Sequence, residues 1–311
     1  MIDIQKNIVL APYTTFKIGG PAKEFVVIEN ENELAEALQY AKDKYLKYYI
    51  LAGGSNMLFA DEGFDGLIIQ IKNQGEINLV ESEKIECWAG INLAQVINFA
   101  RENSLSGLEN LAGIPGSIGG AVRGNAGAFG TEIKNLVEKV RFSDENGMLS
   151  EYSKADCDFE YRSSAFKQDR KLIILSVVLK LEVANKDAIA KKMKEVIQKR
   201  NAKQPTGWVG CAGSFFENPI VRDSNLLEKF EKETKSVARD GKIPAGWLIS
   251  ELGLRGKKIG YIEVSEKHAN FIINTGKGTA QDVVMLISFI KQQVRDNLGI
   301  QLKEEVNYIG Y

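Results

Sequence analysis

The hydrophobic pattern of the first 185 residues predicts short strands interspersed with helices. Apolar runs at 25–28, 47–52 and 66–71 indicate strands, and the run at 172–181 is the strongest strand signal of the chain. Between the first two runs, apolar side chains recur at the spacing of one helix face: Leu34, Ala35, Leu38 and Ala41. Either Asn30 or Asn32 can cap that helix.

Two further pairs of runs predict hairpins. Residues 77–80 pair with 85–89, and residues 137–143 pair with 148–153 across a turn-forming sequence at 144–147. A second helix is predicted at 92–103, where the apolar positions again follow helical spacing: Leu93, Val96, Ile97 and Ala100.

The pattern changes near residue 185, and we place a domain boundary there, giving domains 1–185 and 186–311. Lys186–Lys203 predicts a basic amphipathic helix whose lysines face solvent. Its expected apolar face consists of Ile189, Met193, Val196 and Ile197. The pattern then predicts, in order, a helix at 224–235, an apolar segment at 244–252, a strand at 269–274, a helix at 279–298 and a strand at 300–309.

Composition narrows the class of protein. The 311 residues suit two domains, and 40 basic against 41 acidic residues give no reason to expect nucleic acid or an anionic membrane as a partner. No apolar run is long enough to span a bilayer, and the first six residues lack the pattern of a signal peptide. Three scattered cysteines, Cys87, Cys157 and Cys211, fit a reducing cytoplasm.

The absence of several motifs excludes whole classes of site. His268 is the only histidine, which excludes H-E-x-x-H zinc sites and most other metal sites, so we expect no metal. The sequence contains no G-x-S-x-G elbow, no Walker motif and no G-x-G-x-x-G dinucleotide motif.

Glycine is concentrated in one stretch. Seven of the 29 glycines lie between Gly113 and Gly130, where the only charge is Arg123. Glycines in such numbers cost conformational entropy, and the usual gain is close approach of the backbone to a ligand such as a pyrophosphate. Interleaved apolar residues argue against a flexible linker: Ile114, Pro115, Ile118, Val122 and Phe129.

Four other segments carry polar groups, and each group has a structural and a functional interpretation. The turn Gly53-Gly54-Ser55-Asn56 either binds an anion with its backbone N–H groups or is a tight turn without a ligand. Arg162 is either an ion-pair partner or a fixed positive charge in a site. Ser214 either caps a turn or donates a proton, and Glu304-Glu305 is either a solvated pair or places one carboxyl inside.

Together, in this order, the motifs resemble the UDP-N-acetylenolpyruvoylglucosamine reductase family, from about Thr14 to Gly310. The matching segments are 14–20, 53–56, 113–130, 161–164, 213–216, 245–249, 264–271 and 305–306. The resemblance implies an α+β fold: a vanillyl-alcohol-oxidase-type (PCMH) FAD-binding domain of two α+β subdomains, then an α+β substrate-binding domain. The compact stretch at 185–240 indicates the shorter family type.

The resemblance also implies ligands and partners. FAD is bound non-covalently, because the only histidine lies outside the flavin domain, and NADPH is the reductant. The substrate is a small molecule, UDP-N-acetylglucosamine enolpyruvate, and the enzyme is a cytoplasmic monomer. The FAD-binding residues implied are Gly53, Gly54, Ser55, Asn56, Met57, Gly113, Ile114, Pro115, Gly116, Ser117, Gly119, Gly120, Asn125, Ala126 and Gly127.

Three residues match the catalytic positions of the family. The resemblance implies that hydride passes from flavin N5 to C3 of the enolpyruvyl group and that Ser214 gives a proton to C2. Arg162 and Glu305 would stabilise the enolate formed between these steps. Asn218 and His268 fall where the family contacts the substrate. A strongly basic enolate explains how a serine can act without a histidine.

Two other functions compete with this one. A flavin oxidase of the same fold would not require Ser214, Arg162 and Glu305 together. A binding module without catalysis would have no need for a buried acid. Ser214→Ala separates them, because a reductase should keep its flavin and its NADPH half-reaction but lose enolpyruvyl reduction.

Overall fold

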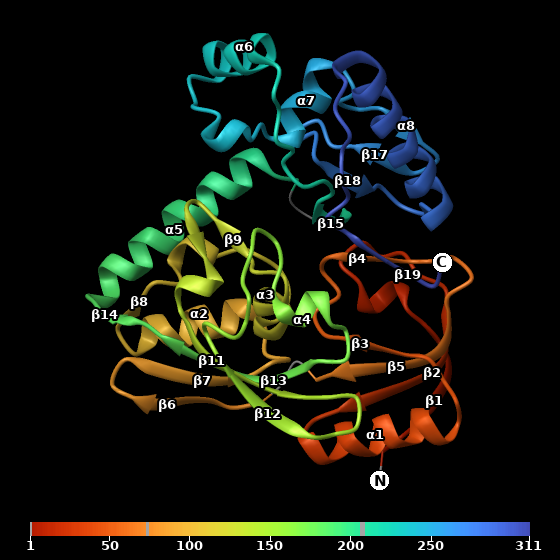
Figure 1. The fold of residues 1–311 in the computed structure, drawn as a ribbon, viewed down its shortest axis with the longest axis vertical. Coiled ribbons are helices and arrows are strands. Elements are labelled where there is room, and N and C mark those ends of the chain that lie inside the picture. The colour runs from red at the N-terminus through yellow and green to blue at the C-terminus, as the bar shows by residue number, and fades with distance from the viewer. Residues whose placement is uncertain (1, 73–74, 206–208) are drawn as a thin grey trace. The chain divides into compact units, whose positions relative to one another are not determined.

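The computed structural model describes residues 2–72, 75–205 and 209–311 (Figure 1). The chain divides into two compact units, each taken by itself below. The first unit contains the residues up to Ile8, Ala22–Gly54 and Phe64–Ala202, and the second contains Val9–Pro21, Ser55–Gly63 and Lys203–Tyr311. Two short N-terminal segments therefore belong to the C-terminal unit.

The first unit begins with a four-stranded sheet in the order β1-β2-β5-β3. Its strands are β1 (Gln5–Val9), β2 (Pro21–Ile28), β5 (Phe64–Ile71) and β3 (Tyr48–Leu51), and the last three run parallel. Helix α1 (Glu31–Asp43) packs its apolar face against β2 and β5. Asn30, not Asn32, caps this helix by accepting the N–H of Glu33 at 3.0 Å.

A five-stranded antiparallel sheet follows, in the order β12-β11-β13-β7-β6. It consists of β12 (Leu149–Ser153), β11 (Val137–Ser143), β13 (Ile173–Lys180), β7 (Lys84–Trp88) and β6 (Ile77–Glu81). Both predicted hairpins are confirmed, because β6 pairs with β7 and β11 pairs with β12. The strong apolar run at 172–181 becomes β13, between β11 and β7.

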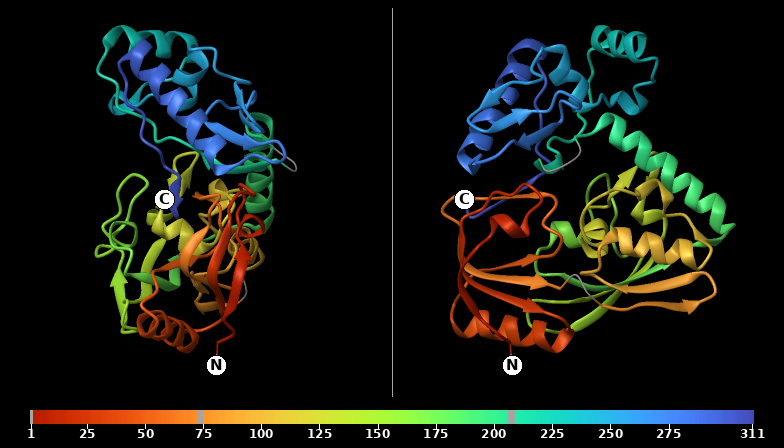
Figure 2. Two further views of the ribbon diagram at one scale, coloured as in Figure 1. Left: turned by 90° about the vertical axis from the view of Figure 1, so that its right-hand side faces the viewer. Right: turned by 180° about the vertical axis from the view of Figure 1, so that it is seen from behind.

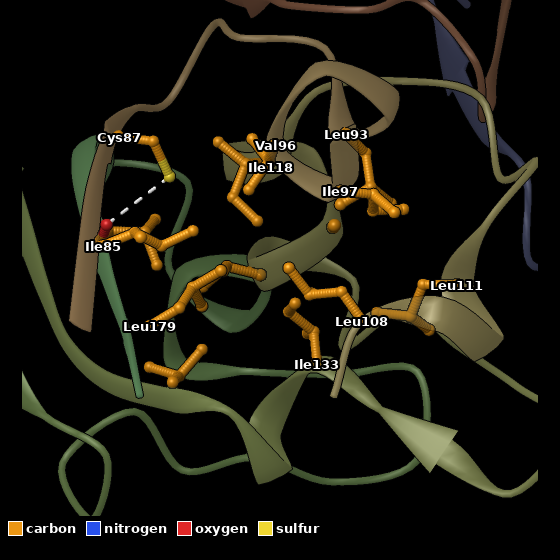
Figure 3. Close-up of a cluster of buried hydrophobic side chains, with 14 of the residues drawn as sticks. Ile85, Cys87, Leu93, Val96, Ile97, Leu108, Leu111, Ile118, Ile133 and Leu179 are labelled. Atoms are coloured by element: carbon orange, nitrogen blue, oxygen red, sulfur yellow. Dashed lines mark hydrogen bonds between the residues drawn. The ribbon is translucent and has the colours of Figure 1, made fainter. Parts of the chain in front are cut away.

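Helices α2 (Leu93–Glu102) and α3 (Ile118–Arg123) bury their apolar faces in one core with the antiparallel sheet (Figure 3). The side chains labelled there come from β7, β13, both helices and the 3-10 turns and loop that follow the helices. Cys87 in this core donates its thiol to the carbonyl of Val177 at 3.6 Å, and burial raises its pKa to about 12. Cys87 is thus a structural thiol.

Helix α5 (Lys186–Lys203) differs from the expectation in two respects. Its residues Ile189, Met193 and Val196 belong to the same core as α2 and α3, so the helix packs with the first unit and not with the residues that follow it. The division therefore falls after Ala202 and not at 185. Ile197 is 40% exposed, so it does not lie on the buried face.

Shorter elements complete the first unit. They are β8 (Leu105–Ser106) paired with β14 (Glu182–Val183), β9 (Gly127–Ala128) paired with β10 (Thr131–Glu132), helix α4 (Ala165–Gln168), and the 3-10 turns Glu109–Leu111 and Ile133–Asn135. Helix α3 lies inside the glycine-rich stretch, where the sequence predicts no helix.

The second unit is built on a four-stranded antiparallel sheet, β15-β18-β17-β16. Its strands are β15 (Gly210–Ser214), β18 (Phe271–Asn274), β17 (Ile262–Val264) and β16 (Lys258–Ile259). Helices α6 (Ser224–Thr234), α7 (Ala245–Glu251) and α8 (Ala280–Leu298) bury residues in its core, and α8 lies along this sheet (Figure 2). Two 3-10 turns lie at Ala11–Tyr13 and Arg239–Gly241.

The N-terminal segments join this unit through backbone pairing. β4 (Met57–Phe59) runs parallel to β19 (Asn307–Ile309). The Asp61 carboxylate after β4 accepts the N–H groups of Ala280 and Gln281 at the start of α8, at 2.8 and 3.0 Å. The predicted strand at 300–309 is wrong for most of its length, because only 307–309 form a strand, and Glu304 adds a single isolated bridge to Phe216.

Candidate active site

Two glycine turns interlock in the first unit. A Cβ placed on Gly53 would lie 2.6 Å from the Cα of Gly116, closer than real Cβ atoms come to any neighbour. Gly116 itself has φ of +113° and Gly113 has φ of +81°, backbone regions that side chains rarely adopt. Gly53, Gly113 and Gly116 are therefore required by close backbone approach or by a positive φ.

The second of these turns leaves backbone donors available. Ser117 caps α3, and its Oγ accepts the N–H of Gly120 at 3.1 Å. Among the described residues, the backbone N–H groups of Gly116 and Ser117 have no hydrogen-bond acceptor, although Ser117 is only 3% exposed. Buried N–H groups are normally paired, so these donors fit the phosphate oxygens of a dinucleotide such as FAD.

Arg162 lies at the end of the glycine stretch. Its guanidinium donates to the backbone carbonyls of Asn125 and Gly127 at 3.4 and 3.1 Å and lies 5.1 Å from the ring centroid of Tyr161. Its φ of +56° is an unusual backbone conformation for a non-glycine residue. The local fold thus holds a strained arginine against the glycine loop, which supports the interpretation of Arg162 as a fixed positive charge in a site.

Asn125 connects the glycine loop to the turn that carries Arg162. Its side chain is fully buried, donates to the carbonyl of Glu160 at 2.7 Å and accepts the N–H of Lys134 at 3.3 Å. Both ends of the amide are engaged within the protein. Asn125 therefore positions the Arg162 turn, and its backbone is engaged as well, because its N–H donates to the carbonyl of Val122 at 3.1 Å and its carbonyl accepts from Arg162.

In the second unit, Ser214 ends β15 immediately after an irregularity in the strand. The pairing with β18 shifts between Cys211 and Ser214, and Gly213 has φ of +78°. A bulge of this kind redirects the next side chain, and bulges are frequent beside active sites. Gly213 thus takes up the irregularity, after which Ser214 pairs again with Phe271, and Phe215 and Phe216 are buried in the core.

Glu305 lies directly beside this segment. Its backbone N–H donates to the carbonyl of Phe215 at 2.8 Å, and its own carbonyl accepts the side-chain amide of Asn56 at 3.2 Å. Asn307 donates from its side chain to the carbonyl of Asn56 at 3.0 Å. Ser214, Glu305 and Asn56, from three distant parts of the sequence, are therefore brought together in the second unit.

The neighbouring Glu304 has a different partner. Its carboxylate pairs with Lys291 of α8 at 2.9 Å. Glu304 thus forms an ion pair with α8. Glu305 is the residue whose backbone is fixed beside Ser214.

The two predicted substrate-contact residues also lie in the second unit. Asn218 accepts the N–H of Ala245 at the start of α7 at 3.1 Å. His268 Nδ1 accepts the N–H of Asn270 at 3.2 Å, so the ring proton of the neutral histidine lies on Nε2. Burial, with a smaller contribution from Arg255, lowers the pKa of His268 and favours that neutral form.

The remaining predicted cofactor residues fall into two groups. Exposed or half-exposed positions are Ser55, Pro115, Gly120 and Gly127; core-facing or ladder positions are Gly54, Met57, Ile114, Gly119 and Ala126. Arg123 is half-buried, and burial lowers the pKa of its guanidinium, so its surroundings are not those of a solvated side chain.

Sequence reasoning missed one residue of this region that the structure makes prominent. Asn270, 3% exposed, accepts the N–H of Phe216 and donates to its carbonyl, each at 2.9 Å. It therefore fixes the backbone two residues after Ser214. Asn270 lies beside His268 in the 264–271 motif, and this position could have identified it as a candidate site residue.

Comparison with known proteins agrees with this geometry. Residues 22–153 match the model of an FAD binding domain, and residues 204–309 match the C-terminal domain of UDP-N-acetylenolpyruvoylglucosamine reductase. The chain is 36% identical over 306 residues to the UDP-N-acetylenolpyruvoylglucosamine reductase of Solibacter usitatus (strain Ellin6076), covering 97% of this chain and 95% of that protein.

Two further relatives extend this result. The reductase of Carboxydothermus hydrogenoformans is 38% identical over 307 residues, covering 99% of this chain and 94% of that protein. The crystal structure of the reductase from Thermus caldophilus has a TM-score of 0.78 and 32% identity, covering 99% of this chain and 100% of that chain.

These matches confirm the expected α+β fold class and the FAD-binding domain. The length of 311 residues fits the shorter family type. Among the helices of the described residues, none has the length and apolarity that a membrane span requires. The roles of individual site residues stay predictions.

Proposed function

The chain belongs to the UDP-N-acetylenolpyruvoylglucosamine reductase family, and we propose that it reduces the enolpyruvyl ether of UDP-N-acetylglucosamine to UDP-N-acetylmuramate with NADPH. It is an oxidoreductase with an FAD-binding domain. Its product would serve peptidoglycan precursor synthesis in the cytoplasm, with the enzyme acting as a monomer.

One observation carries the proposal: the backbone contacts that draw Asn56, Ser214 and Glu305 together. Asn56 belongs to the turn predicted to bind the cofactor, and it holds the carbonyl of Glu305 at 3.2 Å. Glu305 is in turn fixed to Phe215, next to Ser214, at 2.8 Å. A reductase needs its proton donor and its acid beside the cofactor turn, whereas a simple binding module does not.

When bound, FAD supplies hydride transfer from NADPH to C3 of the enolpyruvyl group. The residues that would hold it are the interlocked glycines at 53 and 116, with the backbone N–H groups of Gly116 and Ser117, for which the described part of the chain provides no acceptor. These small residues and open donors fit a dinucleotide, and no lysine is needed for its phosphates.

Arg162 would stabilise the negative charge that develops on C2 and the carboxylate of the substrate. Two carbonyl contacts, to Asn125 and Gly127, fix its guanidinium before any ligand binds. A charge fixed in advance needs no reorganisation as the enolate forms, which is the main advantage of electrostatic stabilisation.

Ser214 would donate the proton that completes the reaction at C2. Its hydroxyl needs no activating histidine, because the acceptor is a strongly basic enolate carbon. Glu305, as a neutral acid, would donate a hydrogen bond to the same enol system. Asn218 and His268 would contact the nucleotide-sugar part of the substrate, His268 through its Nε2–H.

An anaerobic titration tests the proposal. The FAD-loaded protein is first reduced with NADPH, and its flavin absorbance near ~450 nm should bleach because the flavin accepts the hydride. UDP-N-acetylglucosamine enolpyruvate is then added without oxygen. The proposal expects the absorbance to return in proportion to the substrate added, with UDP-N-acetylmuramate as the product.

Two results would contradict the proposal. Absorbance that returns only when oxygen is admitted identifies an oxidase of the same fold. Absorbance that never bleaches with NADPH identifies a flavin-binding protein without this reductase activity. NADH in place of NADPH, in the same cuvette, measures the nicotinamide preference.

A further inference from the structure

Arg162 lies in a turn whose geometry does not suit an arginine. Residues 160–163 form a four-residue turn, in which the N–H groups of Glu160 and Ser163 each donate to the carbonyl of the other residue, at 3.1 and 3.3 Å. Arg162 is the third residue of this turn and has φ of +56°. A positive φ at the third position is typical of turns that carry glycine or asparagine there. A strained residue of this kind persists only where its surroundings hold it.

The side chain of Lys167 holds Arg162 from the carbonyl side. Its Nζ donates to the carbonyl of Arg162 at 2.7 Å. Lys167 belongs to helix α4, in which the neighbouring Phe166 is fully buried in the core of the first unit, so the lysine extends from an anchored turn of helix. Hydrogen bonds from a charged donor are about twice as strong as those between neutral groups. The lysine therefore binds the backbone of the strained residue itself.

The contacts of Lys167 and Asn125 hold opposite halves of the turn. The Asn125 amide donates to the carbonyl of Glu160 at 2.7 Å, which ties the first residue of the turn to the glycine loop. The guanidinium of Arg162 donates to the carbonyls of Asn125 and Gly127, and it reaches them from a backbone with positive φ. A return of Arg162 to the common negative φ would redirect its whole side chain. Lys167 binds the carbonyl that would have to move in such a change.

We propose that Lys167 is a positioning residue for enolpyruvyl reduction, which keeps the strained backbone of Arg162 in the conformation that presents its guanidinium to the developing enolate. Lys167 would act only through Arg162, so its role rests on the proposed function of Arg162 as the charge that stabilises the enolate. Electrostatic stabilisation requires a charge that is in place before the reaction. A displacement of about 1 Å can cost roughly 100-fold in rate.

A direct electrostatic effect of the Lys167 ammonium makes a different prediction. The field of the ammonium at the enolate would be independent of the Arg162 side chain, so the two losses would multiply when both residues are replaced. A positioning role disappears once the Arg162 side chain has been removed. The coupling between the two substitutions therefore separates the two roles.

The test is a double-mutant cycle of Lys167→Met and Arg162→Ala in the FAD-loaded protein. Methionine retains an unbranched side chain but lacks the charge and the donor, whereas Lys167→Arg retains a cationic donor. Stopped-flow absorbance measures enolpyruvyl reduction and flavin reduction by NADPH in each variant. Lys171→Met is the matched control, because Lys171 is exposed shortly after α4, forms only a surface ion pair with Glu145, and its loss changes the net charge equally.

We expect Lys167→Met to slow enolpyruvyl reduction by about 10- to 100-fold, the effect of a misplaced charge. Flavin reduction should stay near the wild-type rate, because no enolate forms in that step. In the Arg162→Ala background, the same substitution should cost less than about threefold, because the side chain through which it acts is already absent. Lys167→Arg should recover most of the loss, and Lys171→Met should behave as the wild type.

Three kinetic results would overturn the proposal. Losses that multiply in the double variant show that Lys167 acts by its own charge or through general stability, and not through Arg162. A wild-type rate of enolpyruvyl reduction in Lys167→Met shows that the turn keeps its conformation without the lysine. Equal slowing of both half-reactions in that variant shows a general defect of the first unit.

Hydrogen exchange tests the positioning role without any catalytic readout. The N–H of Ser163 closes the turn on the carbonyl of Glu160, so Lys167→Met should speed exchange within residues 159–166 by about tenfold or more, the effect of losing a hydrogen bond from a charged donor. Lys171→Met should leave this exchange unchanged. If the wild type fails the anaerobic titration but the exchange still rises in Lys167→Met, the proposed function is wrong and Lys167 nevertheless holds the turn. Unchanged exchange in Lys167→Met would overturn the positioning role, whatever the activity.

Discussion

The two units differ in how their polar groups are paired. In the first unit, the N–H groups of Gly116 and Ser117 and the Nε and Nη2 atoms of Arg200 have no hydrogen-bond acceptor among the described residues. In the second unit, Asn56 and Asn270 are each tied to neighbouring backbone by side-chain amide hydrogen bonds. The first region therefore has donors that can bind a ligand, and the second region uses its side-chain amides to fix the backbone.

This difference fits the proposed roles of the two regions, which are binding of an anionic ligand in the first and proton transfer in the second. Groups that bind an anionic ligand must be unpaired before the ligand arrives, and their local instability is offset on binding. Groups that transfer a proton must be held in place at all times, because a displacement of about 1 Å can cost roughly 100-fold in rate. Substitutions of single residues in each region can separate these two properties.

The largest effect is expected from Ser214→Ala. Loss of the proton donor should lower the rate of enolpyruvyl reduction by about 10²- to 10⁴-fold, the usual contribution of general acid catalysis. Stopped-flow absorbance measures the two half-reactions separately. Reduction of the flavin by NADPH should stay near the wild-type rate, because the proposed proton transfer from Ser214 belongs to the enolpyruvyl half-reaction alone.

Two outcomes would contradict the proposal that Ser214 acts only in enolpyruvyl reduction. If Ser214→Ala purifies without flavin, the serine supports the cofactor and is not the proton donor. If both half-reactions slow equally, the two regions are not separable in function. Ser265→Ala, a buried serine elsewhere in the same unit, is the control for a general loss of stability.

A large effect on the cofactor is expected from Gly53→Ala. The new Cβ would lie 2.6 Å from the Cα of Gly116, so the two turns must separate. Overpacking of this kind costs about 1–3 kcal/mol and should displace the N–H groups that FAD would use. Fluorescence titration of the apoprotein with FAD measures the loss of affinity.

Gly124→Ala is the matched control for this prediction. Gly124 lies in the same glycine stretch, but its φ is not positive, and the nearest atom to an added Cβ is 3.5 Å away. FAD affinity should stay near the wild-type value in this variant. Equal losses in the two variants would mean that any added methyl group in this region disturbs the cofactor, and the interlocked turns would then have no special role.

Much of this arrangement could be predicted from the sequence, because local patterns determine it. The capped helix at 31–43, both hairpins and the long helix at 280–298 follow from apolar spacing and cap residues. The glycine stretch was identified from composition alone. The contact of Arg162 with the glycine loop was not predicted, because it joins residues about 35 positions apart.

The features that could not be predicted depend on long-range pairing. The parallel contact of β4 with β19 joins residues about 250 positions apart, and it assigns residues 55–63 to the C-terminal unit. Nothing local indicates such a partner. The predicted face of α5 was wrong at one position for a related reason. Ile197 fits the apolar spacing as well as Val196 does, and only the tertiary core decides which of the two is buried.

A moderate effect on stability is expected from Asn270→Ala. This side chain accepts the N–H of Phe216 and donates to its carbonyl, both in the core of the second unit. Its removal leaves two buried backbone groups unsatisfied, which should lower the free energy of unfolding by about 2–4 kcal/mol. Thermal unfolding of the FAD-loaded protein measures this change.

Asn297→Ala provides the comparison for that loss. Asn297 is exposed on α8 and donates to the carbonyl of Gln293, so its removal should change stability by less than about 0.5 kcal/mol. If Asn270→Ala is equally mild, the backbone after Ser214 is held by packing alone. If enolpyruvyl reduction slows while flavin reduction does not, Asn270 also positions the proton donor.

The smallest effect is expected from the pH dependence of stability, and it isolates His268. Burial lowers the pKa of this ring in the folded protein, and Nδ1 accepts the N–H of Asn270 only in the neutral form. The unfolded chain therefore binds the proton more readily. The stabilisation by neutral His268 is fully present above the unfolded pKa of about 6.5 and is lost as the pH falls through the folded pKa.

Because His268 is the only histidine, no second imidazole obscures this range. The free energy of unfolding, measured in urea at fixed FAD concentration, should rise from pH 5 to pH 7 in the wild type and rise less steeply in His268→Gln. The glutamine cannot titrate, so the difference between the two slopes belongs to the ring. Identical slopes would mean that the ring is protonated as readily in the folded protein as in the unfolded chain. The backbone around Asn270 would then not hold His268 as an acceptor, and the second region would be less firmly fixed than its hydrogen bonds indicate.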